Sequence, residues 1–244
     1  MIHKIATILV LLCAAAFAVP ADAAGLAGRL ANDYGVPRPF LPVTLSQAAW
    51  HFHGPRLIYS RWPIAFRNFS FYGRSRRNWL YAGGRRTMSI EGSASSLTNL
   101  INWLPQTGPP SCLKTTQDWN TPAPLPSESG SLAGEVVALT MNVAFNDTRV
   151  MPRQPGYDLE AFRISRGLFR WRTVGEVLHI SNRVLGGDPP VIFGLSGYQE
   201  LVDILSSINS NYEFRNYGTY VDRGYLIPNR PLGRPDPPHD PHVP

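Results

Sequence analysis

Three pairs of residues in this sequence have types and spacings that could support chemistry. Ser111 and Lys114 fit the S-x-x-K pattern, in which a lysine activates a serine nucleophile at the start of a helix. A Pro-Pro pair precedes this serine and no Lys-Thr-Gly motif is present, so we expect a loop here and no nucleophile. His51 and His53 would point to the same side of a strand, which suits a metal ion. No acidic residue occurs between positions 34 and 90 to complete a ligand set, so we expect ordinary hydrogen-bonded or exposed histidines.

A third pair, Asp158 and Glu160, could act as a general acid and base. Acidic residues two positions apart in a polar loop are usually just solvated, so we expect no catalysis from them. The sequence has no G-x-S-x-G, H-E-x-x-H, P-loop or dinucleotide-binding motif. We therefore predict no catalytic residue, no metal site and no cofactor.

The strongest candidate for function is a segment rich in arginine and aromatic residues. Nine Arg and no acidic residue occur from position 34 to 90, whereas from position 91 onward 12 Lys and Arg face 15 Asp and Glu. Aromatic rings stack on sugar or base faces and arginine binds anionic groups, so the segment suits acidic polysaccharide or extracellular DNA. The alternative is that the aromatic residues form the core of a β-layer whose arginines are solvated. The predicted polyanion-binding residues are Arg61, Arg67, Arg74, Arg76, Arg77, Trp79, Arg85 and Arg86.

The first 23 residues have the pattern of a secretory signal peptide, with Lys4, an apolar run from Ile5 to Val19, and an Ala-Asp-Ala cleavage site. The apolar run is shorter than the roughly 20 residues that a bilayer requires, and no later segment is apolar enough to span one. We predict a secreted or cell-surface protein, and the low cysteine content favours a bacterial one. Removal of this leader leaves Cys112 as the only thiol, either buried or available for an intermolecular disulfide and self-association.

The remaining chain is predicted to form one α+β domain over residues 24–227. Residues 26–92 are expected to be β-rich, with local alternation in 61–91 and Gly-rich turns at 73 and 83–84. The Pro-rich tail, 228–244, is expected to be disordered.

Three or four short helices are predicted within residues 93–213. The stretch "SLAGEVVALTMNVAFND" (131–147) has two adjacent apolar stripes, so it should be surrounded on several sides. Within it, Glu135 should favour the positive end of the helix dipole, and Asn142 should bond to the backbone of an adjoining loop. Capping boxes at Thr173/Glu176 and at Ser196/Gln199 predict the starts of two later helices.

In combination, these helices resemble a helical module of secreted and cell-surface proteins of environmental bacteria. The resemblance covers roughly residues 87–213 and centres on a Gly-x-x-x-Ala-Leu-x-x-Asn-Val motif, matched here by Gly134, Ala138, Leu139, Asn142 and Val143. That module carries no established activity, so the resemblance implies location and a structural role. The Arg-rich segment and the Pro-rich tail lie outside the resemblance.

Together these observations predict a secreted, non-enzymatic extracellular matrix or surface-interaction protein that binds polyanions through its Arg/aromatic segment. The alternative is a carbohydrate-active enzyme, or a domain docked on one.

Overall fold

The computed structural model describes residues 43–67, 76–119, 128–151, 157–215 and 219–228. The predicted signal peptide lies outside these ranges, and so does the Pro-rich tail after its first residue, Pro228. Helices and small sheets form an α+β fold, which confirms the predicted fold class. Four of the six α-helices among the described residues lie within 93–213, in agreement with the three or four predicted there, and the other two precede this region. None of these helices has both the length and the apolar character that a bilayer-spanning segment requires.

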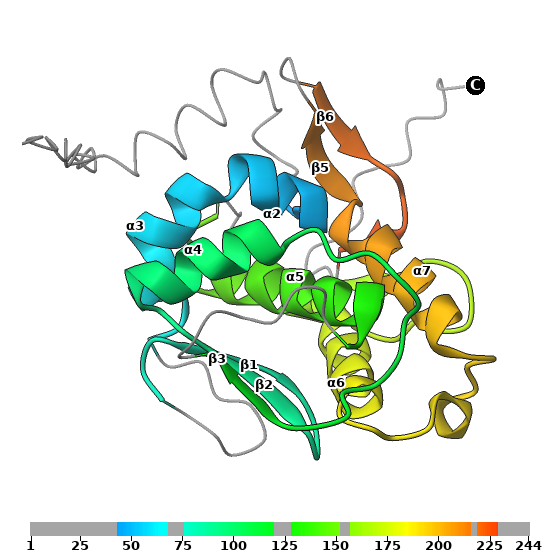
Figure 1. Cartoon of the computed structure of the whole chain (residues 1–244). Coiled ribbons are helices and arrows are strands. Elements are labelled where there is room, and N and C mark those ends of the chain that lie inside the picture. The colour runs from blue at the N-terminus through cyan, green and yellow to red at the C-terminus, as the bar shows by residue number, and fades with distance from the viewer. Residues whose placement is uncertain (1–42, 68–75, 120–127, 152–156, 216–218, 229–244) are drawn as a thin grey trace, which may run out of the picture.

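Helix α5, Gly130–Asp147, is the centre of the molecule. Figure 1 shows it in the middle, with α2 (Gln47–His53), α3 (Pro55–Ala65) and α4 (Ala94–Trp103) above it. Every residue from position 132 to 146 is buried, as the two adjacent apolar stripes predicted. The small residue Gly134 allows α2 to come close, because a Cβ at this position would overlap the side chain of Gln47.

Helices α2 and α3 correct the prediction of a β-rich segment over residues 26–92. Their buried residues follow helical spacing, since Ile58, Trp62 and Phe66 lie four positions apart and all are fully buried. Gly54 separates the two helices, and Pro55 occupies the first position of α3, where its missing N–H costs nothing. Frequent aromatic residues and Pro63 inside α3 concealed this helical pattern.

The predicted strands in the later part of the segment are present. Strands β1 (Trp79–Gly83) and β2 (Thr87–Glu91) form an antiparallel hairpin, and β3 (Gln117–Trp119) pairs with β2 in parallel. Leu80 and Ile90 are fully buried cross-strand partners. The hairpin is buried against the helices, with β1 against α5 and α6 and β2 against α4.

The last two helices are α6 (Val174–Leu185) and α7 (Tyr198–Asn209). The capping box of Thr173 and Glu176 is confirmed at the start of α6, with both reciprocal hydrogen bonds formed. The box predicted at Ser196 and Gln199 is wrong. Gly197 is the N-cap of α7, and the N–H and hydroxyl of Ser196 donate instead to Glu200, at 2.7 and 2.8 Å. A backbone N–H and a hydroxyl bond to the ionised carboxylate more strongly than to its neutral form, so they lower the pKa of Glu200.

Short elements connect and follow these helices. Helical turns η1 (Leu159–Ala161) and η2 (Pro190–Phe193) flank α6. Strand β4 (Arg163–Ile164) pairs with β7 (Leu226–Ile227), and β5 (Tyr212–Arg215) pairs with β6 (Thr219–Asp222).

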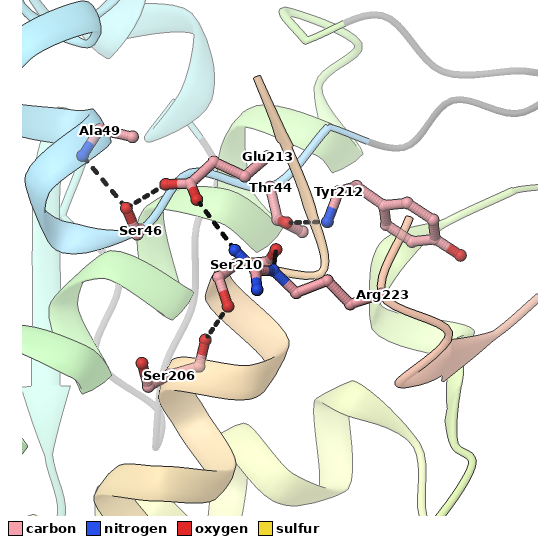
Figure 2. A network of polar contacts seen from close by, with 8 residues as sticks. All are labelled: Thr44, Ser46, Ala49, Ser206, Ser210, Tyr212, Glu213 and Arg223. Atoms are coloured by element: carbon pink, nitrogen blue, oxygen red, sulfur yellow. Dashed lines mark hydrogen bonds and ion pairs between the residues drawn. The ribbon is translucent and has the colours of Figure 1, made fainter. Parts of the chain in front are cut away.

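A polar network joins the beginning of the described chain to its end (Figure 2). The N–H of Tyr212 in β5 donates to the hydroxyl of Thr44 at 2.9 Å. The hydroxyl of Ser46, which caps α2 by accepting from Ala49, donates to Glu213. Glu213 also faces Arg223 at 3.8 Å. These bonds fix the start of α2 against β5, although the two segments are far apart in the sequence.

Candidate functional site

Part of the predicted Arg/aromatic segment gathers where α3 ends and β1 begins. The N–H of Asn78 donates to the carbonyl of Phe66 at 3.0 Å, and the indole N–H of Trp62 donates to the carbonyl of Asn78 at 3.1 Å. These two bonds bring the chain just before β1 back to the end of α3. Arg67 therefore lies close in space to Arg76 and Arg77, and the side chains of all three are exposed.

Trp79 adds an aromatic surface to these arginines. The guanidinium carbon of Arg76 lies 5.5 Å from the centre of the Trp79 ring, within the range of a cation–π contact. The rings of Trp79 and Tyr81 are stacked, with centres 6.3 Å apart and planes 17° apart. We call Arg67, Arg76, Arg77 and Trp79 the arginine cluster. It presents three exposed cations, of which Arg76 contacts the half-buried ring of Trp79, an arrangement that suits an anionic polymer with flat sugar or base faces.

The other predicted binding residues do not belong to this cluster. Arg85 and Arg86 lie in the turn at the opposite end of β1, about 13 Å from Trp79 along the strand at about 3.3 Å per residue. Arg86 has a structural role, because its guanidinium donates to the carbonyl of Leu113. Arg61 is half-buried in α3, and Arg74 lies outside the described residues.

The S-x-x-K pair lies in a loop, as its preceding prolines predicted. The hydroxyl of Ser111 donates to the backbone carbonyl of Glu128 at 2.8 Å, and Lys114 is exposed. Cys112 is half-buried and forms no disulfide with any described residue. Its sulfur lies 3.8 Å from a guanidinium nitrogen of Arg86.

The two histidines lie on α2 and not on a strand, so the expected common side is wrong. Residues two positions apart on a helix project about 200° apart. The ring N–H of His51 donates to the carbonyl of Ile101 at 2.8 Å, and His53 is exposed. In the part of the chain that the structure describes, no three His, Cys, Asp or Glu residues group in a way that could hold a metal ion.

Asp158 and Glu160 line an open pocket of about 450 Å³ together with Asp147, Ala161 and Thr173. Glu160 has a structural explanation, because it packs against Gly175 in the first turn of α6, where a Cβ would overlap its side chain. A carboxylate at this end of a helix interacts favourably with the helix dipole. Three carboxyl groups nevertheless line this one pocket. The spacing of Asp158 and Glu160 brought that pair to attention, but no sequence pattern indicated that Asp147 lies beside them.

A second polar feature, which the sequence analysis missed, lies inside the core around Glu135. This carboxyl group accepts hydrogen bonds from the side chains of Gln47, at 2.9 Å, and Asn209, at 2.7 Å. Desolvation by burial raises the pKa of Glu135, with a further contribution from the negative charge of Glu213. The neighbours of Glu135 on α5 are apolar on both sides, and this pattern is a sequence signal for a buried acid. The helix-dipole role predicted for Glu135 does not describe it, because its carboxyl group bonds to side chains of α2 and α7 and not to the start of α5.

Asn142 and Asn209 extend this network. The amide of Asn142 donates to Asn209 at 2.9 Å, and it both accepts from the N–H of Leu45 and donates to its carbonyl, at 2.9 Å each. The predicted role of Asn142, bonding to the backbone of an adjoining segment, is confirmed. All of these groups bond to one another inside the protein, so the network connects elements of the fold and leaves the arginine cluster as the better candidate site.

The resemblance of residues 87–213 to a bacterial helical module stays a prediction, because no family model, no curated protein and no solved structure matches this chain.

Proposed function

We propose that this protein is exported and acts without catalysis as a surface-interaction protein, by binding polyanions at the arginine cluster. The observation that supports this most directly is the exposed group of Arg67, Arg76 and Arg77 beside Trp79. Each arginine that neutralises an anionic group releases a counterion from the polymer, so several together give salt-dependent affinity. The ring of Trp79 adds stacking, which does not depend on the sequence of the polymer.

Charge around the cluster also supports this proposal. Glu91, opposite Trp79 in the register, is the one acidic residue of the β1–β2 hairpin, and the three arginines of the cluster outnumber it. Neither Arg76 nor Arg77 forms an ion pair with a carboxylate among the described residues, and both lie outside regular elements. Their charge is therefore available to a ligand.

The test uses the triple substitution Arg67→Gln, Arg76→Gln and Arg77→Gln. Binding of the wild type to polygalacturonate and to duplex DNA is measured over a range of salt concentrations. The affinity of the wild type should fall steeply with salt, and the triple variant should reduce the slope of log affinity against log salt by about 2 to 3.

The matched control removes three exposed cations from elsewhere, as Arg56→Gln, Arg85→Gln and Lys114→Gln. Since this control loses the same net charge, it separates a local site from a general charge effect. Equal losses in both triple variants, or no binding by the wild type at low salt, would refute the proposal.

The pocket of Asp147, Asp158 and Glu160 favours a carbohydrate-active enzyme as a second candidate. Glycoside hydrolysis commonly uses two carboxyl groups on either side of a bound sugar. A screen of polysaccharide and ester substrates tests it, with Asp158→Asn and Glu160→Gln as variants. Turnover that either substitution abolishes would favour this candidate over a binding protein.

A further inference from the structure

A second basic surface, absent from the predicted segment, lies on the hairpin formed by residues 163–172. The N–H of Ile164 donates to the carbonyl of Arg172, and the N–H of Trp171 donates to the carbonyl of Ile164, at 2.9 Å each. Trp171 and Arg172 thus both face Ile164, which is the arrangement of a β-bulge. A turn closed by the N–H of Arg170 and the carbonyl of Gly167 forms the tip.

The backbone of Trp171 has a conformation that a bulky residue rarely adopts. Its φ is +71°, in the left-handed region where glycine is the usual residue of such a bulge. Burial of the indole does not explain this strained backbone, because the residue is 52% exposed. Strained residues of this kind are concentrated at functional sites, so Trp171 suggests a ligand surface.

Aliphatic side chains are also exposed on the same hairpin and on η2. Leu168 at the hairpin tip is 46% exposed, and Val191 and Ile192 of η2 are 72% and 56% exposed. Leu168 lies against the end of η2, since a Cβ on Gly194 would be 3.7 Å from its Cδ1 atom. The hairpin and η2 therefore expose apolar side chains next to each other, whereas most other large apolar residues of the described chain are buried.

The same hairpin carries a concentrated positive charge. The sequence from position 161 to 175 contains no acidic residue, and its four arginines are all exposed: Arg163, Arg166, Arg170 and Arg172. The guanidinium carbon of Arg170 lies 4.8 Å from the centre of the Trp171 ring. Asp188, an acidic residue between α6 and η2, forms an ion pair with Arg183 at 2.7 Å. It therefore already has a partner outside the hairpin.

We propose that this patch, which we call the hairpin patch and define as residues 163–172 with Val191 and Ile192, docks onto an anionic lipid bilayer. The exposed apolar side chains enter the headgroup region, where tryptophan is favoured, and the arginines bind lipid phosphates. A soluble polyanion would bind the arginines but would not bury the exposed leucine, valine and isoleucine side chains. A bilayer with anionic headgroups matches both. This inference concerns a different surface and a different ligand from those of the proposed function.

The test measures co-sedimentation of the mature chain, residues 24–244, with two kinds of vesicle. One kind is pure phosphatidylcholine and the other contains phosphatidylglycerol. Removing the apolar residues 1–23 avoids their own insertion and leaves every described residue in place. The wild type should bind the anionic vesicles at least tenfold more strongly than the neutral ones, and binding should weaken as salt rises.

The variant Trp171→Gly separates binding from folding, because glycine adopts a φ of +71° without strain. Its melting midpoint should be unchanged or higher, while its binding to anionic vesicles should fall at least fivefold. The variant Val191→Ser with Ile192→Ser tests the second half of the patch independently of the bulge. The control Phe52→Ser, which removes an apolar ring of 72% exposure on α2, should leave vesicle binding unchanged.

Three results would overturn the inference. The first is no binding of the wild type to anionic vesicles at low salt. The second is a folded Trp171→Gly variant, or a folded Val191→Ser/Ile192→Ser variant, that binds them like the wild type. The third is binding that the Arg67/Arg76/Arg77 triple variant abolishes while Trp171→Gly retains it, since this would assign the lipid contact to the arginine cluster. The proposed function is tested by soluble polyanions, so either proposal can fail alone.

Discussion

The buried amide of Asn142 shows how one polar side chain can fix the path of a distant segment. It satisfies both backbone groups of Leu45, a residue 97 positions away, and also donates to Asn209. A buried backbone N–H or C=O without a partner is costly, so the segment before α2 is held to α5 by this side chain.

Asn142→Ala should therefore lower the free energy of unfolding by at least about 2 kcal/mol, because it leaves the N–H and C=O of Leu45 without partners. Chemical denaturation measures this value. The control Asn102→Ala, at an exposed position of α4, should change it by less than about 0.5 kcal/mol. A loss at Asn142 as small as that of the control would mean that water replaces the amide.

The buried carboxyl group of Glu135 should make stability depend on pH. Burial raises its pKa in the folded protein above the ordinary value of 4.5, so as pH rises the unfolded chain loses this proton first. The protonated side chain stabilises the folded protein. This contribution is fully present below pH 4.5 and is lost as pH rises through the raised pKa of Glu135.

The comparison is with Glu135→Gln, which resembles the protonated acid at every pH. The unfolding free energy of the wild type minus that of the variant should fall as pH rises above about 4.5 and then become constant. Denaturant titrations from pH 4 to 8 measure this difference. A difference that grows with pH would show that the hydrogen bonds from Gln47 and Asn209 outweigh the desolvation.

Among the elements, the helices with regular spacing and clear boundaries were predictable from the sequence. The two apolar stripes of α5 and the capping box of α6 both indicated their structure, because these signals arise within one element. Helices α2 and α3 were missed, because aromatic residues and Pro63 favour extended structure locally. Packing of Trp50 and Trp62 in the core outweighs this preference, and a sequence pattern does not show such tertiary contacts.

The central place of α5 leads to a prediction at Leu139, which is fully buried. Leu139→Ala should lower the free energy of unfolding by about 2 to 5 kcal/mol, because it removes buried apolar atoms and leaves a cavity. A chemical melt checks this value. A loss below about 0.5 kcal/mol would contradict the central position of the helix.

At the scale of the whole molecule, tertiary contacts divide the arginines that the sequence grouped together. The bond between Asn78 and Phe66 places Arg67 beside Arg76 and Arg77, whereas the β1–β2 hairpin carries Arg85 and Arg86 to its other end. The sequence could therefore predict a basic segment and its residue types. It could not predict which arginines share a surface, nor that the hairpin patch forms a second basic surface.

The most direct test of the arginine cluster is an amide NMR titration of residues 24–244 with short polygalacturonate oligomers. The proposal predicts that signals of residues 64–67 and 76–81, together with the indole N–H of Trp79, shift in proportion to bound ligand and return as salt is added. Signals of α7, which lies on the opposite side of the molecule from α3 in Figure 1, should stay in place. Shifts confined to the pocket residues 158–161, or no shifts at low salt, would contradict the account.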